Sequence, residues 1–276
     1  MSLPQLDTSR FPAPSAVPTS TARGKETAGG VTVTDLAFHG GEIGESEAYL
    51  VAPADGGDGP AILFFHWLEG GAPTSNRTEF LDDARGLAHR GVTSLLVQGT
   101  LPWRERPASI EHDRKLIERE VAMLRRAVEL LLAQPRVDPA RLVGVGHDFG
   151  GMYLTLLFGV ERRIAALVLM APTARWADWF TAYWRLEDAA EDYAAALAPL
   201  DPIEWLALAG GRPVLLQFAS DDEYVPAEVA AEISAAAGTI AEARIYAAGH
   251  ALSEEARIDR EAWLADRLGL LAEAPG

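Results

Sequence analysis

The sequence contains no cysteine among its 276 residues, and this absence removes several classes of chemistry at once. Without a thiol the chain has no disulfide, no thiolate-bound metal and no cysteine nucleophile. No apolar run reaches the ~18 residues that a membrane-spanning helix requires. The sequence also lacks a P-loop, the His-Glu-x-x-His pattern of zinc proteases and any internal repeat. We therefore expect neither a cofactor nor a metal.

Basic residues are scarce: 24 Lys and Arg stand against 40 Asp and Glu, which gives a formal net charge of −16. A nucleic-acid partner needs a basic patch, and an anionic membrane surface attracts basic segments, so both partners are disfavoured. The expected partner is a small-molecule substrate, and the composition leaves open whether the protein forms a homo-oligomer. A chain of this length can bury a sizeable core as one α/β domain.

Residues 1–30 are rich in Pro, Ser, Thr, Ala and Gly and contain no apolar stretch of the kind found in signal peptides. This composition predicts a flexible N-terminal arm rather than part of the core. Because this segment shows no export signal, we expect the protein to be cytoplasmic.

A glycine-rich corner near the middle of the chain carries most of the functional information. The apolar run 142–145 predicts a strand and residues 152–160 predict a helix, so a sharp turn lies between them. Its sequence is Gly146-His147-Asp148-Phe149-Gly150. This is the spacing of a nucleophile elbow, in which small residues two positions either side of the nucleophile let the turn close. The nucleophile is usually Ser, whereas this sequence has Asp148.

Two other interpretations of the same glycines can be weighed against the rest of the chain. A dinucleotide-binding turn would need a third glycine where Phe149 stands and an acidic residue ending a strand about 20 residues later, and the sequence has neither. A plain structural turn would have no partners downstream in the order nucleophile, acid, histidine.

Both partners appear downstream, each at the end of a predicted strand. The apolar run 213–219 is followed by Asp221 and Asp222, and the weaker run 243–247 is followed by His250. An acid in the first of these loops would orient the His250 ring and stabilise its cation. We choose Asp222 as this acid and keep Asp221 as the alternative.

With this elbow and the partners in this order, residues 31–272 resemble the α/β-hydrolase superfamily. The body is most similar to dienelactone hydrolase-like proteins, whereas the elbow Gly-His-Asp-Phe-Gly-Gly resembles that of epoxide hydrolases and haloalkane dehalogenases. The resemblance implies an α/β fold with a mostly parallel sheet flanked by helices, and a catalytic triad of Asp148, Asp222 and His250. It also implies an oxyanion hole, which by position would use the backbone N–H groups of Trp67 and Phe149.

The predicted elements agree with such a fold. Continuous apolar runs at 61–65, 92–97 and 164–170 predict strands that are buried on both faces. Strands alternating with helices indicate a parallel sheet. Residues 31–38 and 48–51 predict an antiparallel pair at one edge.

Residues 173–212 are predicted to form a small helical cap, inserted into a core made of residues 31–172 and 213–276. Four of the seven tryptophans fall in this insertion. Aromatic residues at this density indicate a pocket with an apolar lining and few polar tips, although most of them would attach the cap to the core. The candidate pocket residues, from the cap and from the loop 98–108, are Trp103, Trp176, Trp179, Tyr183, Trp184 and Tyr193.

A carboxylate nucleophile favours attack on an sp3 carbon, which gives an alkyl ester on Asp148 that a water activated by His250 can hydrolyse. An epoxide also needs an acid, which Tyr183 or Tyr193 would supply, whereas a halide needs N–H donors. We therefore rank epoxide hydrolysis first, C–halogen hydrolysis second, and dienelactone hydrolase-like hydrolysis of esters or lactones third. The alternative from another class is a non-hydrolytic, ligand-binding relative.

Overall fold

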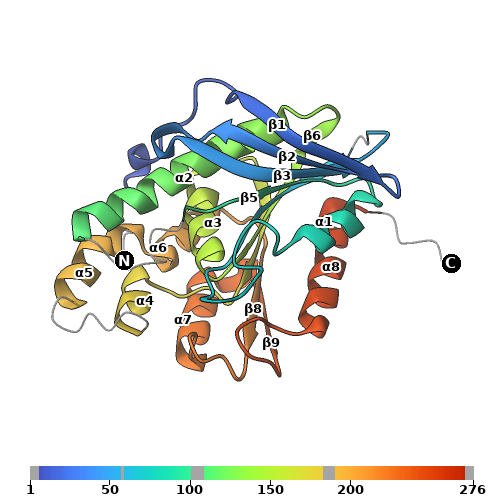
Figure 1. The fold of residues 1–276 in the computed structure, drawn as a ribbon. Coiled ribbons are helices and arrows are strands. Elements are labelled where there is room, and N and C mark those ends of the chain that lie inside the picture. Colours follow the sequence, from blue (N-terminus) through green and yellow to red (C-terminus); the bar gives the residue numbers. More distant parts are fainter. Residues whose placement is uncertain (1–5, 57–58, 101–108, 183–189, 271–276) are drawn as a thin grey trace.

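The computed structural model describes residues 6–56, 59–100, 109–182 and 190–270. Its centre is a nine-stranded sheet with helices on both faces (Figure 1). The strand order is β1-β2-β3-β5-β4-β6-β7-β8-β9. The strands are β1 Ser20–Ala28, β2 Val31–His39, β3 Glu45–Pro53, β4 Gly59–Phe65, β5 Thr93–Val97, β6 Val137–His147, β7 Ile164–Met170, β8 Val214–Ala219 and β9 Ala241–Tyr246.

The sheet has an antiparallel edge and a parallel body, as the sequence predicts. β1, β2 and β3 pair antiparallel, and β3 pairs antiparallel with β5. From β5 through β4, β6, β7 and β8 to β9, every neighbouring pair is parallel. The carboxyl ends of these parallel strands therefore meet at one edge, where ligands bind in open α/β sheets.

Helices cover both faces of the sheet. Figure 1 shows α2, α3 and α7 on one face and α1 and α8 on the other. Alternate residues of β4 join the two resulting hydrophobic clusters: Leu63 and Phe65 face α2 and α3, whereas Ile62 and Phe64 face α1 and α8. This explains why β4 is apolar throughout. The helices are α1 Leu81–Ala88, α2 Ile110–Leu132, α3 Phe149–Val160, α4 Trp176–Ala182, α5 Ala190–Leu197, α6 Pro202–Leu206, α7 Ala227–Ala237 and α8 Glu254–Leu268.

The N-terminal segment is more ordered than its composition predicts. Ser20–Ala28 forms β1, although all of its side chains are exposed. Hydrogen bonding to β2 stabilises this strand without buried side chains, so the expectation of a flexible arm is wrong for these residues. Phe11 is also fully buried, and its ring lies 5.2 Å from that of Trp205.

The segment 173–212 contains α4, α5 and α6 and is attached to the core through Trp205. This side chain is fully buried, and its indole N–H donates to the Pro199 carbonyl at 3.0 Å. A Cβ added at Gly159 of α3 would lie only 2.6 Å from the Trp205 ring. Within the described ranges, no helix is long and apolar enough to span a membrane.

The predicted elbow packs against the end of β4 through backbone atoms alone. A Cβ added at Gly150 would lie 2.1 Å from the Phe65 carbonyl oxygen and 2.6 Å from that of His66. A Cβ at Gly146 would lie 2.6 Å from the carbonyl carbon of Gly150. Both contacts are too short for any side chain, which accounts for the two glycines of the motif.

This packing predicts that Gly150→Ala lowers the free energy of unfolding by about 2 kcal/mol or more, because the methyl group would have to displace the backbone of β4. The matched control is Gly86→Ala in α1, where nothing lies within 4 Å of the added Cβ. That change should raise the free energy of unfolding by roughly 0.5–1 kcal/mol through helix propensity. Denaturant unfolding measures both, and equal effects would contradict the close approach.

Candidate active site

Asp148 makes the turn between β6, which ends at His147, and α3, which begins at Phe149. Its backbone has φ 52° and ψ −119°, a conformation that residues other than glycine rarely adopt. Two hydrogen bonds hold it: the Asp148 N–H donates to the Met170 carbonyl at 2.7 Å, and its own carbonyl accepts the Met152 N–H at 3.0 Å. The turn thereby places the Asp148 side chain at the carboxyl edge of the sheet.

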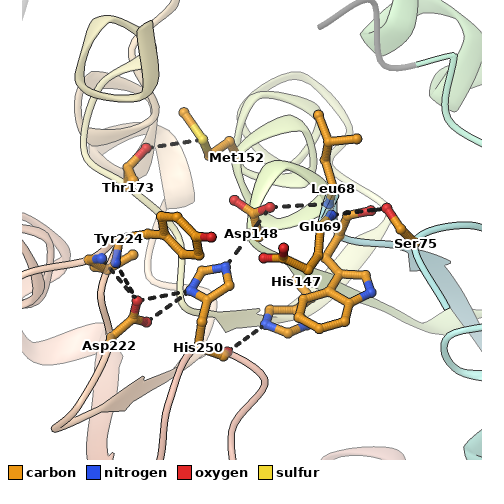
Figure 2. Close-up of polar contacts among 12 residues, drawn as sticks. Leu68, Glu69, Ser75, His147, Asp148, Met152, Thr173, Asp222, Tyr224 and His250 are labelled. Atoms are coloured by element: carbon orange, nitrogen blue, oxygen red, sulfur yellow. Dashed lines mark hydrogen bonds and ion pairs between the residues drawn. The ribbon is translucent and has the colours of Figure 1, made fainter. Parts of the chain in front are cut away.

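The structure brings Asp148, Asp222 and His250 together from three separate loops (Figure 2). Nδ1 of His250 lies 3.0 and 2.9 Å from the two carboxylate oxygens of Asp222. Nε2 of the same ring lies 4.0 Å from Asp148 Oδ2. Asp222 Oδ1 also accepts the backbone N–H groups of Tyr224 and Val225, at 2.9 and 3.0 Å. An imidazole between two carboxylates is the arrangement that a nucleophile, a base and an orienting acid require.

Of the two candidate acids, Asp222 contacts His250, whereas Asp221 is exposed and its backbone N–H donates to the Ala248 carbonyl. The sequence did not single out Tyr224, which follows Asp222 by two residues. The ring of Tyr224 meets that of His250 edge-on, with 4.9 Å between centroids. Figure 2 shows its hydroxyl directed toward Asp148. Only its closeness to Asp222 in the sequence could have pointed to it.

The pKa values in this buried group favour a proton on His250. Burial alone would lower the pKa of His250, but its interactions with the Asp148 and Asp222 carboxylates outweigh burial and raise the pKa to about 10. Burial raises the pKa of Asp148, and the His250 cation opposes that rise. For Asp222, burial is the largest cause and acts to raise the pKa, but the hydrogen bond and charge of His250 and the N–H groups of Tyr224 and Val225 together outweigh it and lower the pKa.

The backbone donor that faces Asp148 belongs to Leu68. Its N–H donates to Asp148 Oδ2 at 3.1 Å (Figure 2). The prediction that Trp67 supplies this N–H is wrong, because the Trp67 N–H donates instead to the Glu79 carboxylate at 2.8 Å. Phe149, the second predicted donor, directly follows Asp148 as the first residue of α3.

Two atoms at the centre of the site lack a hydrogen-bond partner among the described residues. They are Oδ1 of Asp148 and Nε2 of His250, and both are buried. Buried polar atoms are nearly always paired, so two unpaired ones on neighbouring side chains indicate a place for a substrate or a water. Among the residues that the structure describes, no group of three or more His, Cys, Asp or Glu is arranged to hold a metal ion.

The predicted pocket aromatics fall into different environments. The ring of Trp179 lies 4.9 Å from that of Phe149 and 6.0 Å from that of His250, so Trp179 lies beside the site. Trp176 is fully buried, and its indole N–H donates to the Leu200 carbonyl at 2.7 Å. It therefore attaches α4 to the rest of the insertion.

Tyr193 does not reach the site. Its buried hydroxyl donates to the Asp113 carboxylate of α2, because α5 packs against α2. Burial and this hydrogen bond raise the pKa of Tyr193. The prediction that it lines the pocket is wrong in this conformation. Trp103, Tyr183 and Trp184 lie outside the described residues.

No protein-family model matches the sequence, and no curated protein matches it. Among solved structures, acetyl xylan esterase 1 from Thermoanaerobacterium sp. has a TM-score of 0.69 at 13% identity, covering 91% of this chain and 88% of that chain. An acetyl xylan esterase from Paenibacillus sp. has a TM-score of 0.69 at 17% identity, covering 92% and 89%. A Klebsiella pneumoniae protein provisionally named a dienelactone hydrolase has a TM-score of 0.61 at 17% identity, covering 91% and 99%. The chain therefore has the α/β-hydrolase fold.

The raised pKa of His250 predicts a specific loss of stability with pH. A histidine whose pKa rises from 6.5 to about 10 on folding stabilises the protein fully below pH 6.5, and that contribution disappears as the pH rises through 10. Asp148→Asn removes one of the two carboxylates, so it should lower the pKa of His250. NMR titration of the His250 ring in both proteins measures this. The same pKa of His250 in both proteins would show that Asp148 does not raise the pKa of His250.

Proposed function

We propose that the protein is a hydrolase that cleaves a C–O bond of a small carboxylic ester or lactone. In this proposal Asp148 is the nucleophile, His250 is first the proton donor and then the base, and Asp222 orients His250. Two facts support it: the convergence of these three side chains, and the fold shared with proteins named as esterases.

The position of His250 between two carboxylates is the observation that carries the choice of leaving group. Its interactions with Asp148 and Asp222 raise the pKa of His250 to about 10, which favours a proton on the ring at neutral pH. A departing oxygen needs a proton, whereas a halide leaves without one. The Nε2 atom, 4.0 Å from Asp148 Oδ2, is placed to protonate an oxygen that leaves a carbon bound by Asp148. Substrates with an oxygen leaving group are therefore favoured over haloalkanes.

The two oxygens of Asp148 have different roles in this mechanism. Oδ1 has no hydrogen-bond partner among the described residues, so it is the oxygen that attacks the substrate carbon. Oδ2 is held by the Leu68 N–H and remains the carbonyl oxygen of the covalent intermediate. Water then attacks the carboxyl carbon of Asp148, and the Leu68 N–H stabilises the negative charge that develops on Oδ2.

Formation of the intermediate also changes the pKa of His250. The acylated Asp148 is neutral, so His250 loses one of the two charges that raise its pKa. Since His250 has given its proton to the leaving oxygen, the neutral ring can accept a proton from the attacking water. The water oxygen becomes part of Asp148, and the second product leaves as a carboxylate.

Attack on an ester carbonyl gives a mixed anhydride, which is a demanding intermediate because the Asp148 carboxylate is itself a good leaving group. Proton transfer from His250 to the alkoxide makes the alcohol the better leaving group and drives the step forward.

Leu68 supports a second candidate, epoxide hydrolysis, because its N–H is bound to Asp148 itself rather than open to a substrate carbonyl. An epoxide would give an alkyl ester on Asp148, the intermediate that this donor suits.

Epoxide hydrolysis, the first choice from the sequence, falls to second place because one of its two expected acids is not at the site. The Tyr193 hydroxyl is bound to Asp113, and Tyr183 lies outside the described residues. Tyr224 lies beside His250 with its hydroxyl toward Asp148, which places a candidate acid for an epoxide at the site (Figure 2).

The proposal predicts that Asp148 gains heavy oxygen during turnover. After many turnovers of p-nitrophenyl acetate in water enriched in heavy oxygen, mass spectrometry should find the label in the peptide that contains Asp148. The peptide that contains Asp222 should stay unlabelled and is the internal control. Asp148→Asn should lower kcat by about 10⁴-fold or more, as removal of a nucleophile does.

Parallel assays with styrene oxide and a chloroalkane separate the candidate reactions. Turnover of the ester with label in Asp148 supports the main proposal, and turnover of the epoxide alone supports the second candidate. Turnover without label would mean that no water attacks the Asp148 carboxyl carbon and would overturn the proposed breakdown of the intermediate. Binding of these compounds without any turnover would favour the ligand-binding alternative.

A further inference from the structure

Glu79 joins the loop after β4 to the elbow through two hydrogen bonds. Its Oε2 accepts the Trp67 N–H at 2.8 Å, and its Oε1 lies 2.6 Å from Nδ1 of His147. The carboxylate is largely buried, and it lies between β4 and α1 in the chain. Trp67 is followed directly by Leu68, the donor to Asp148. Glu79 therefore holds the peptide next to the donor.

His147 extends the same connection to the loop that carries His250. Its Nε2 lies 3.1 Å from the His250 carbonyl oxygen, and a carbonyl oxygen can only accept, so Nε2 carries a proton and donates it. Nδ1 is left for the bond with Glu79. The His147 ring is buried, and the Trp67 indole stacks on it with 4.8 Å between centroids and 12° between planes.

These contacts form two closed circuits through His147. In the first circuit, His147 donates to the His250 backbone carbonyl, and the His250 ring lies beside Asp148, the next residue after His147. In the second circuit, His147 binds Glu79, and Glu79 accepts the Trp67 N–H. The next backbone N–H, that of Leu68, donates to Asp148 and closes this circuit. The two groups that must act on Asp148 are thus located by one buried pair.

We propose that Glu79 and His147 are a positioning pair that holds the Leu68 N–H and His250 against Asp148, and that Glu79 thereby sets the rate at which the covalent intermediate breaks down. This inference rests on the proposed function, because the Leu68 N–H acts on charge that develops on Asp148 Oδ2. Loss of one oxyanion donor costs about 10²–10³-fold in rate, and loosening it should cost a part of that. Formation of the intermediate relies less on this donor, so the two steps should respond differently.

Three substitutions separate the position of Glu79 from its charge. Glu79→Gln removes the charge but keeps both bonds: its carbonyl oxygen can accept the Trp67 N–H, and its amide can donate to Nδ1 of His147. Glu79→Asp keeps the charge on a shorter side chain that cannot reach both partners. Glu79→Ala removes both properties. If the position of the Glu79 side chain is what matters, the Gln variant should break down the intermediate at the wild-type rate, and the Asp and Ala variants should break it down more slowly.

A matched control is available in the same cavity. Glu79, His147 and Trp67 line a cavity of about 270 Å³ that also includes Asp83 and Arg260. Asp83 accepts a hydrogen bond from Arg260 at 3.0 Å and contacts neither Trp67 nor His147 through a hydrogen bond among the described residues. Asp83→Asn therefore removes a carboxylate charge from the same cavity without touching the two circuits.

The test is rapid-mixing kinetics with p-nitrophenyl acetate, combined with acid quenching and intact-mass spectrometry. Release of p-nitrophenolate gives the rate of formation, and the decay of the adduct gives the rate of breakdown. In Glu79→Ala and Glu79→Asp, breakdown should slow by at least about tenfold while formation changes by less than about threefold, so the adduct accumulates. Glu79→Gln and Asp83→Asn should keep the wild-type ratio of the two rates.

Each other outcome overturns the inference. Equal slowing of both steps in the Asp and Ala variants would mean a merely structural role. A Gln variant as impaired as Ala would mean that charge, not position, matters. Wild-type kinetics in all variants would mean that Glu79 has no role in either step. Failure of the proposed function is distinct, because wild-type protein would then show neither adduct nor heavy oxygen in Asp148.

Discussion

The backbone contact between the elbow and the end of β4 is the constraint on which the rest of the site depends. With no side chain at Gly150, the first turn of α3 lies directly against the Phe65 and His66 carbonyl groups. That approach brings the residues after β4 close enough for Leu68 to donate to Asp148. The strained φ of 52° at Asp148 is offset by backbone hydrogen bonds on both sides of the turn. Asp148 and the Leu68 N–H are therefore located by one backbone contact.

Charge pairing is the second constraint, because the site buries three carboxylates. A buried charge is strongly unfavourable unless it is paired and hydrogen-bonded. Asp148 and Asp222 share His250, and Glu79 is paired with His147. The two imidazoles are only 5.4 Å apart between ring centroids, so the pairs form one connected group. Removing any single member leaves a buried partner without its hydrogen bond or ion pair, which explains why position and charge must be tested separately.

The sequence was sufficient for the features that are set locally or by strand order. Continuous apolar runs predicted β4, β6, β7 and β8, and the order nucleophile, acid, histidine predicted which loops meet. It failed where a tertiary contact decides. β1 has no buried side chain and is held by pairing with β2. The N–H that faces Asp148 belongs to Leu68 rather than to Trp67, because the Trp67 N–H donates to Glu79. Tyr193 does not reach the site, because its hydroxyl donates to Asp113. Glu79 and Asp113 are not visible from local pattern, since they lie 12 and 80 residues away from Trp67 and Tyr193 in the chain.

An aspartate at the elbow changes when protons are needed rather than which residues handle them. A serine nucleophile must lose its proton to the histidine before it attacks, whereas in the proposed mechanism Asp148 attacks as a carboxylate and His250 holds the proton, which its raised pKa favours. The first step of that mechanism then needs only a leaving group that can use this proton. The second step needs His250 neutral, and conversion of Asp148 to a neutral anhydride or ester removes one of the two charges that raise the pKa of His250. In this proposal, the aspartate that stands in place of serine at the elbow therefore also controls the change of His250 from acid to base.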